Sequence, residues 1–304
     1  MAQTQPLVAT LIAKPGALDD AAIARARAEL PGAGAPQWLA PGEAADLPFN
    51  AERGADQSAL HSNLAARLRA TLGGGIDAVV QRPDNRRKRL FLADMDSTMI
   101  GQECIDELAD FVGLKDHVAA ITERAMRGEI AFEPALRERV ALLKGLPAST
   151  VDTVIAERIT LTPGGRVLVA TMRAAGARTC MVSGGFTLFT DRIAAMIGFD
   201  ENRANRLEVA GGTLAGTVAE PIFGRDAKRT ALIALRGQLG LDNADTMAIG
   251  DGANDIAMIA EAGLGVAFHA KPKVAELAPA RIDHGDLTAM LYIQGYRKDE
   301  FVGD

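Results

Sequence analysis

The sequence is poor in the features that mark disulfide scaffolds and nucleic-acid-binding proteins. It has two cysteines, Cys104 and Cys180, whose spacing fits neither a metal site nor a disulfide framework, and we expect both to be reduced, buried thiols. The net charge is −6 at pH 7, whereas a general nucleic-acid-binding face is basic. The composition therefore argues against nucleic acid as a partner and leaves open a locally positive pocket for an anionic substrate.

Long apolar runs are also missing. No stretch approaches the about 18 apolar residues of a membrane-spanning helix, and no cationic start leads into an apolar segment. We therefore expect no membrane span, no signal peptide and a cytoplasmic location. Hydrophobic residues make up 48% and charged residues 24% of the 304 positions, an ordinary balance for a globular protein long enough for two domains.

The most informative stretch is residues 90–98, in which a short apolar run ends in two aspartates, Asp94 and Asp96. Such a run is typical of a buried parallel strand, and ligands of open α/β sheets bind outside the carboxyl ends of the strands. Two carboxylates this close repel each other unless a cation lies between them or one of them is protonated. The pair therefore indicates a metal site, an acid/base pair, or an aspartate nucleophile beside a metal ligand.

Residues 1–82 differ in character from the rest and predict a small N-terminal α+β module. Its expected strands and helices alternate, at 7–12, 19–30, 37–39, 57–72 and 76–80. A polar, basic segment at 82–89 follows, which we interpret as a solvated boundary. A second domain is expected over 88–304.

The second domain begins with the strand at 90–93 and continues into a mainly helical insertion at about 102–160. Strands are expected after the insertion, separated by helices, at 178–182, 246–249 and 265–268. This alternation predicts an α/β fold with a doubly wound, mostly parallel sheet and a helical cap.

Three of the predicted strand ends carry unusual residues, and in a parallel sheet they converge on one edge. The carboxylates of this edge are Asp94, Asp96, Asp251 and Asp255. Four carboxylates without His or Cys favour a hard cation, Mg²⁺ most of all. The Ser-Gly-Gly at 183–185 offers N–H groups and a hydroxyl to a phosphate, and Lys228 offers a positive charge. Each pattern taken alone also has an ordinary explanation, such as a turn, a capped loop or a solvated lysine.

Together, in this order, the four patterns resemble the motifs of the haloacid-dehalogenase-like phosphohydrolases. The finer pattern, over about 88–295 and including the cap, resembles the phosphoserine phosphatases among them. The resemblance implies a HAD-like, Rossmannoid fold and Mg²⁺ as the cofactor. It also implies hydrolysis of O-phosphoserine to serine and phosphate through an aspartyl phosphate, a step of serine biosynthesis.

The resemblance carries roles to individual positions. Asp94 matches the nucleophile, and Asp96 the general acid and base. The matching Mg²⁺ ligands are Asp94, Asp251 and the backbone carbonyl of Asp96, with Asp255 supporting the metal shell. The positions that match phosphate-binding or substrate-binding residues are Ser183, Gly184, Lys228 and Asn254.

The cap holds the expected determinants of substrate choice. Glu103 matches a glutamate suited to an α-ammonium group, and Arg139 an arginine whose planar guanidinium binds an α-carboxylate. Met126 and Phe132 match apolar residues that line the closed pocket. Arg137 lies on another helical face, so Arg139 is the prediction. By residue type alone, a surface acid, a solvated arginine and two core residues are the alternatives.

The N-terminal module has no counterpart in the minimal members of the family. Its order of elements loosely resembles the amino-acid-binding, ACT-like regulatory modules of longer phosphoserine phosphatases. Serine sensing is one interpretation, and packing or oligomerisation, as in a homodimer, is the other. The alternative activity for the whole chain is a related phosphatase or phosphotransferase acting on phosphothreonine or homoserine. The alternative from another class is an inactive amino-acid-binding regulatory protein.

Overall fold

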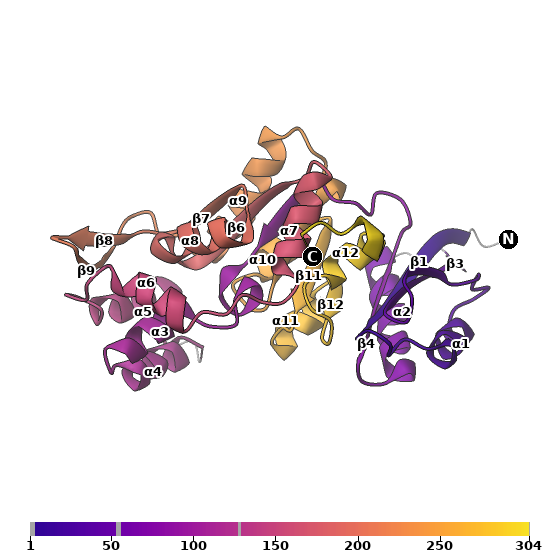
Figure 1. The fold of residues 1–304 in the computed structure, drawn as a ribbon, viewed down its shortest axis with the longest axis horizontal. Helices are drawn as coiled ribbons and strands as arrows, with labels where there is room; N and C mark the ends of the chain where they lie inside the picture. Colours follow the sequence, from indigo (N-terminus) through magenta and orange to yellow (C-terminus); the bar gives the residue numbers. More distant parts are fainter. Residues whose placement is uncertain (1–3, 53–55, 127–128, 304) are drawn as a thin grey trace.

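The structure is a computed structural model that describes residues 4–52, 56–126 and 129–303. Figure 1 shows three parts in a row: an N-terminal module on the right, a large sheet with its helices in the middle and a helical cap at the lower left. The carboxyl terminus lies in the middle part, close to the N-terminal module.

The N-terminal module is a four-stranded antiparallel sheet with two helices packed on one face. In chain order it contains β1 (Thr4–Ala13), α1 (Asp20–Glu29), β2 (Gln37–Ala40), β3 (Ala44–Glu52), α2 (Gln57–Leu72) and β4 (Ile76–Gln81). The strand order β2-β3-β1-β4 is that of a ferredoxin-like split β-α-β fold. Asp19 and Asp56 start the two helices by accepting hydrogen bonds from backbone N–H groups of the first turn.

Strand β3 was not predicted, because its sequence contains Pro48. Proline has no N–H to give to a ladder and is therefore usually confined to strand edges. β2 pairs with β3 only between Ala44 and Asp46, so at Pro48 the edge of β3 that faces β2 has no paired residue. The opposite edge of β3 pairs with β1 along its whole length.

The two faces of this sheet have different neighbours. One face packs on α1 and α2 through residues such as Leu11 and Leu68. The other face contributes Ile12 and Val79 to the core of the larger domain. The N-terminal module is therefore packed against the rest of the chain through apolar side chains as well as polar ones.

The central sheet is parallel, with strand order β12-β11-β10-β5-β6-β7. Its strands are β5 (Leu90–Ala93), β6 (Arg178–Phe186), β7 (Glu201–Asn205), β10 (Thr246–Gly250), β11 (Leu264–Phe268) and β12 (Ala280–Ile282). The helices around it are α7 (Gly165–Ala174), α8 (Thr187–Ile197), α9 (Arg225–Gln238), α10 (Ile256–Glu261), α11 (Pro272–Leu277) and α12 (Ala289–Ile293). The predicted α/β class is confirmed. The outer strands β7 and β12 were not predicted, because one is polar and the other has three residues.

The cap is inserted between β5 and α7. It contains α3 (Cys104–Phe111), α4 (Lys115–Met126), α5 (Phe132–Ala141) and α6 (Thr150–Glu157). The chain enters and leaves it side by side, since the Gly101 N–H donates to the Thr160 carbonyl oxygen at 3.0 Å. A hairpin of the central part, β8 (Leu207–Ala210) and β9 (Thr213–Val218), supports the cap through two backbone bonds of 2.8 Å between Leu214 and residues 145 and 146.

The basic segment at 82–89 is only partly a solvated boundary. Arg82 and Arg87 keep about half of their side chains exposed, at 51% each. The side chain of Arg86 is only 12% exposed and pairs with Asp46 of the N-terminal module. Lys88 is also buried, and its Nζ donates to two backbone carbonyls. The interpretation as a solvated segment is therefore wrong for Arg86 and Lys88.

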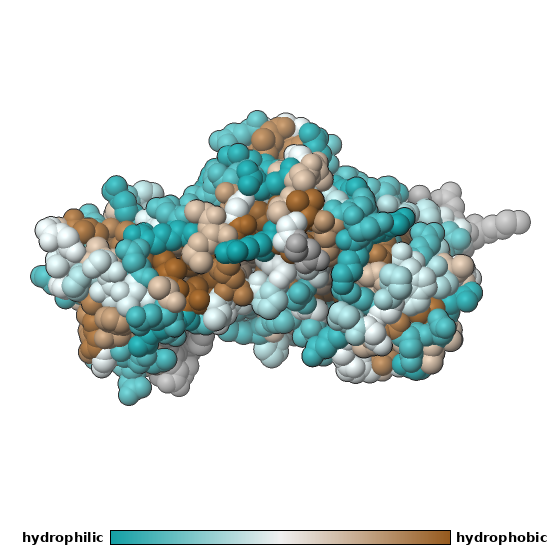
Figure 2. All heavy atoms as spheres, in the orientation of Figure 1, coloured by the Kyte–Doolittle hydropathy of each residue, from teal (hydrophilic) through white to brown (hydrophobic). Residues whose placement is uncertain are grey.

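The face shown in Figure 2 is mostly polar, and most of its apolar residues lie over the left part and the middle of the view. The large exposed apolar side chains of the described residues include Phe111, Val112 and Phe132 of the cap and none of the N-terminal module. No helix within the described ranges combines the length and the apolar character needed to cross a membrane.

Candidate active site

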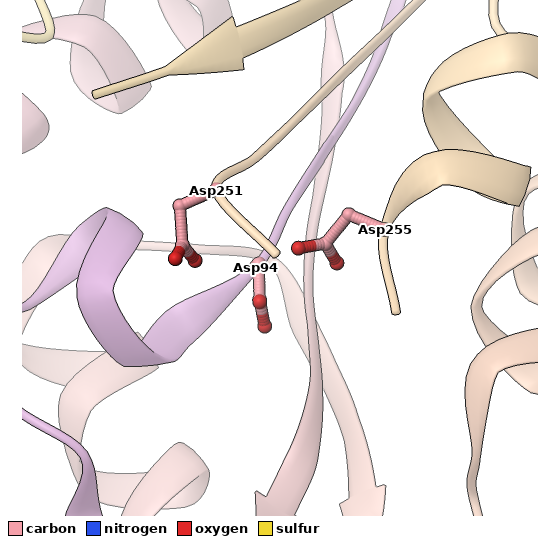
Figure 3. A group of neighbouring side chains, drawn as sticks. All are labelled: Asp94, Asp251 and Asp255. Atoms are coloured by element: carbon pink, nitrogen blue, oxygen red, sulfur yellow. The ribbon is translucent and has the colours of Figure 1, made fainter. Parts of the chain in front are cut away.

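Three buried carboxylates meet at the carboxyl edge of the central sheet (Figure 3). Asp94 follows β5, Asp251 follows β10, and Asp255 precedes α10. Their ligand oxygens lie within 4.8 Å of one another. The exclusively oxygen donors and the high negative charge suit a hard divalent cation.

Lys228 of α9 lies among these carboxylates and is fully buried. Its Nζ is 2.6 Å from Asp94 Oδ1 and 2.7 Å from Asp255 Oδ1. Burial works against the ammonium charge, but Asp255 and Asp94 outweigh it and raise the pKa of Lys228. The lysine therefore stays charged and neutralises part of the cluster.

One lysine does not balance three carboxylates. Burial, followed by the nearby charge of Asp255, raises the pKa of Asp94 well above its usual value. The same two causes raise the pKa of Asp251. The site thus holds more negative charge than its own cations compensate, which is the condition under which a bound cation is most stabilising.

The backbone around the cluster is shaped to hold it. A Cβ at Gly250 would collide with the Asp255 carboxyl, so this position accepts only glycine. Thr98 is buried, and its Oγ1 donates to Asp251 Oδ1 at 3.3 Å. Ser97 has a φ of +56°, an unusual conformation for a residue with a Cβ, which turns the chain away from β5.

The Asp96 carboxylate lies outside this cluster. Asp96 Oδ1 accepts from the Cys104 N–H at 2.9 Å, and Oδ2 accepts from Ser183 Oγ at 3.1 Å. Burial raises the pKa of Asp96. Its carboxylate is not one of the three clustered ones, so among its groups only the backbone carbonyl fits the metal role that the resemblance implies.

Ser183 and Gly184 lie near the end of β6, which continues to Phe186 and not merely to Val182 as predicted. Ser183 is fully buried and its Oγ accepts from the Gly185 N–H at 2.8 Å. The serine hydroxyl therefore bridges Asp96 and the backbone of the Ser-Gly-Gly segment.

Phe132 brings the cap into contact with this segment. A Cβ at Gly184 would lie 3.6 Å from the Phe132 ring, and one at Gly224 would lie 3.4 Å from it. The Phe132 ring therefore lies within contact distance of both glycines. Phe132 keeps 39% of its surface exposed, so it covers the site without belonging to the core.

Glu103 and Arg139 supply opposite charges from two places in the cap. Glu103 precedes α3, and its Oε1 accepts from Ser97 Oγ at 2.8 Å. Partial burial in the site, followed by the charge of Asp96, raises the pKa of Glu103 to about 7. Arg139, half-buried on α5, interacts with the charges of Asp106 and Glu103. Its Nη1 also donates to Thr122 Oγ1 at 3.3 Å.

With this geometry in view, the comparisons with known proteins identify the family. The model of the haloacid dehalogenase-like hydrolases matches residues 91–260. The chain belongs to this family. The membership predicted from the motifs is thereby confirmed.

Among the haloacid dehalogenase-like hydrolases, the chain is similar to proteins named phosphoserine phosphatases. The chain is 46% identical over 224 residues to a phosphoserine phosphatase of Polaromonas sp., which covers 71% of this chain and 95% of that protein. The crystal structure of a HAD family hydrolase from Salmonella enterica serovar Typhi has a TM-score of 0.82 at 26% identity, covering 97% of this chain and 99% of the other. A probable phosphoserine phosphatase from Vibrio cholerae has a TM-score of 0.72 at 30% identity, covering 97% and 88%. Both structures therefore extend over the N-terminal module as well.

The structure also places the remaining residues that the sequence analysis considered for the site of this haloacid dehalogenase-like chain. Arg137 pairs with Glu133 and Glu220 at the surface, away from Glu103. Asn254 lies half-buried in the loop of Asp251, with its Oδ1 against Gly252. The Met126 side chain lies outside the described residues.

Sequence reasoning missed one charged neighbour, Lys271. Its Nζ is 3.8 Å from Asp251 Oδ2, and its backbone N–H donates to the Asp251 carbonyl at 3.1 Å. Sequence reasoning also gave Thr98 no role. Lys271 follows β11, whose end lies on the same sheet edge, so inspection of that fourth strand end was the available signal.

Proposed function

We propose that the protein is a Mg²⁺-dependent phosphoserine phosphatase, hydrolysing O-phosphoserine to serine and phosphate. One observation carries the proposal: phosphate-type groups and amino-acid-type groups face a common site. Ser183, Lys228 and the three carboxylates lie at the sheet edge. Glu103 senses the charges of Asp96 and Asp251 at this edge, and Arg139 senses the charge of Glu103. The 46% identity to a phosphoserine phosphatase supports the same substrate.

Asp94 is the proposed nucleophile. One of its carboxylate oxygens attacks phosphorus and forms an O–P bond, while the bond from phosphorus to the serine oxygen breaks. Lys228, 2.6 Å from Asp94, limits the repulsion between this carboxylate and the phosphate. A water then attacks the aspartyl phosphate, which releases inorganic phosphate and restores Asp94.

Asp96 is the proposed general acid and base. Its raised pKa favours the protonated form that can give a proton to the departing serine oxygen. The resulting carboxylate then takes a proton from the attacking water. The Cys104 N–H and Ser183 Oγ hold the Asp96 carboxyl apart from Asp94, so the two aspartates can take different roles.

The residues present fit Mg²⁺, because the cluster offers only oxygen ligands and its negative charge exceeds the positive charge of Lys228. We assign Asp94, Asp251 and the backbone carbonyl of Asp96 as ligands. Asp255 supports them through its bonds to Lys228 and to the Gly252 N–H. When bound, Mg²⁺ supplies Lewis-acid polarisation of the phosphoryl group and offsets its charge.

The substrate assignments follow the two ends of phosphoserine. Glu103 receives the α-ammonium and Arg139 the α-carboxylate, which a guanidinium can bind through two parallel hydrogen bonds. Ser183, Gly184 and Lys228 bind the phosphate, and Asn254 contributes a polar contact. Phe132 covers the site, and Met126 is assigned to the same apolar wall.

Phosphate release from phosphoserine, with Mg²⁺ added and with the metal chelated, tests the proposal. We expect turnover that depends on Mg²⁺. Phosphothreonine is run in parallel as a substrate, because one extra methyl gives only about 1–3 kcal/mol of discrimination. Homoserine is added as an acceptor, because transfer of the phosphoryl group to it would indicate a phosphotransferase. Serine binding without any phosphate release would instead support an inactive regulatory protein.

For the rest of the chain we propose a division into an N-terminal ACT-like module, 1–82, and a phosphatase domain, 88–304, with the cap at about 102–160. The outer strand β2 has unpaired backbone groups along one edge, which favours association with a second copy as a homodimer. Light scattering of the purified protein tests this. We further propose a cytoplasmic location and a role in serine biosynthesis.

A further inference from the structure

Asn205, the last residue of β7, is a buried polar residue that takes no part in the proposed reaction steps. It is 2% exposed. Its Nδ2 donates to the carbonyl oxygens of Gly184 at 2.9 Å and of Phe223 at 3.0 Å. Its Oδ1 accepts from the Phe223 N–H at 2.6 Å. Both polar atoms of the amide are therefore engaged with backbone groups of two separate segments.

The first of these segments lies outside the regular sheet ladder. β6 pairs with β7 at Val182–Arg203 and again at Phe186–Asn205, and the register shifts between these two pairs. Four steps along β6 thus oppose two steps along β7. Ser183 to Gly185 therefore lack regular ladder positions against β7, and the Asn205 amide takes over part of that function by binding the Gly184 carbonyl.

The second segment leads into the helix of the buried lysine. Phe223 immediately precedes Gly224, the residue before α9, and α9 carries Lys228 in its first turn. Two bonds from Asn205 to Phe223 fix the start of this helix. A single side chain thereby connects the backbone of the Ser183–Gly184 segment, at the Gly184 carbonyl, with the helix that carries Lys228.

The cap contacts the same two segments. The Phe132 ring lies close to Gly184 and Gly224. Asn205 connects the two segments that contain these glycines, through the carbonyl of Gly184 and the peptide of Phe223. The two segments that Asn205 connects therefore also form the surface that Phe132 contacts.

We propose that Asn205 is a positioning residue for phosphate, which sets the distance between the Ser183–Gly184 segment and the helix of Lys228. This inference rests on the proposed function of the same site and deepens it. Asn205 does not touch the reacting atoms. It acts through the two segments that do, in the way that supporting hydrogen bonds hold the ligands of a metal site.

The test compares Asn205→Leu, which fills a similar volume without hydrogen bonds, with Asn205→Ala, which also leaves space. The matched control is Asn202→Ala. Asn202 is on the same strand and its side chain is also hydrogen-bonded, to Thr190 and Asp191. Binding of inorganic phosphate and of L-serine to the Mg²⁺-loaded protein is measured by calorimetry, with kcat, KM and the melting temperature.

We expect both Asn205 variants to bind inorganic phosphate at least about 5-fold more weakly and to lose roughly 10–100-fold in kcat, the range typical of groups that hydrogen-bond to metal ligands and act, like Asn205, through the residues they hold. L-Serine binding should stay within about 2-fold, because Glu103 and Arg139 lie in the cap. Asn202→Ala should change the melting temperature only.

Three results would overturn the proposal. The first is a lower melting temperature with unchanged phosphate affinity and kcat, which assigns Asn205 to stability alone. The second is equal weakening of phosphate and serine, which assigns it to the whole site. The third is failure of both variants to fold. Because phosphate binding is measured directly on the wild type, the test keeps its meaning even if phosphoserine proves not to be the substrate.

Discussion

The molecule contains two sets of buried carboxylates that differ in how completely they are paired. One set, Glu43, Asp46 and Asp77, lies where the N-terminal module meets the central domain. The other set, Asp94, Asp251 and Asp255, lies at the carboxyl edge of the central sheet. Both are withdrawn from water, so the difference between them comes from their partners.

Each carboxylate of the first set is matched by donors of the other part of the chain. Asp77, fully buried on β4, accepts three backbone N–H bonds of 2.7–3.1 Å from residues 283–285. Asp46 faces the guanidinium of Arg86, which also donates to two carbonyls of α12. Glu43 accepts from the Tyr292 hydroxyl and from Lys298. These bonds join the module firmly to the central domain.

The second set has three carboxylates and one buried lysine between them. The pKa of Asp94 and that of Asp251 are raised by burial and by Asp255, which means that their charged forms are not fully compensated. Buried carboxylates with a complete set of donors stabilise the structure, whereas an incomplete set marks a place where a ligand completes the charge balance.

The largest effect is expected for Asp94→Asn compared with Asp77→Asn. Loss of the nucleophile should lower kcat by roughly 10⁴-fold or more, the scale on which removal of a nucleophile acts. The fold should persist, because Lys228 keeps its bond to Asp255. Steady-state phosphate release and far-UV circular dichroism measure the two properties. Comparable turnover by Asp94→Asn and wild type would show that another group attacks phosphorus.

The next effect concerns the metal. Without Mg²⁺, the raised pKa values of Asp94 and Asp251 mean that the folded state binds more protons than the unfolded state between about pH 4, where the unfolded carboxyls titrate, and the higher pKa values of the folded state, so stability falls as the pH rises through this window. Mg²⁺ at 100 times its dissociation constant should restore about 2.7 kcal/mol at pH 7. Thermal melting measures the gain. Asp251→Asn should abolish most of it, and an equal gain in this variant would place the ion elsewhere.

Asp77→Asn should have a smaller effect, and on stability alone. An amide offers one acceptor oxygen where the carboxylate offers two, so at least one buried N–H of residues 283–285 loses its partner. A loss of about 2 kcal/mol in the free energy of unfolding is expected. Urea denaturation measures it, and kcat below the melting range should remain that of the wild type. A fall in kcat without loss of stability would make this junction part of the catalytic apparatus.

The difference between the two sets could be predicted only in part from the sequence. Asp94 and Asp251 follow short apolar runs, and a strand end with acidic residues is a local pattern. The elements with strong local signals were predicted well, such as α2, which begins after Asp56 and ends before Gly73. The partners of Asp77 are backbone groups some 200 positions away, and no local pattern contains them.

The remaining errors have the same physical origin. Strand β7 is polar because it is an outer strand, and only its neighbour β6 makes it a strand. Arg86 is buried because Asp46 lies opposite it, 40 positions earlier in the chain. The Asp96 carboxyl is held by the hydroxyl of Ser183, which lies 87 positions further along the chain. Each is decided by contacts that form only in the folded chain.

The smallest expected effect is the pH dependence of serine binding through Glu103. Its pKa of about 7 means that the ionised fraction rises from about 10% at pH 6 to about 90% at pH 8. Only the ionised form attracts the α-ammonium, so the affinity for L-serine should rise roughly 5–10-fold over this interval. L-Serine is the better probe, since the phosphate of phosphoserine itself titrates near pH 6.

Glu103→Gln separates this carboxyl from all other titrating groups. Its affinity for serine should be low and nearly independent of pH, because a neutral amide replaces the group that titrates. The matched control is Glu107→Gln on α3, the helix that Glu103 precedes, and the Glu107 carboxylate faces Arg158 and not the site. It should retain the wild-type profile. Glu103 is exposed to water, which weakens the effect of neighbouring charges on its pKa. A wild-type affinity for serine that does not change between pH 6 and pH 8 would mean that Glu103 is already ionised at pH 6. Glu103 would then resemble the fully paired carboxylates of the module junction.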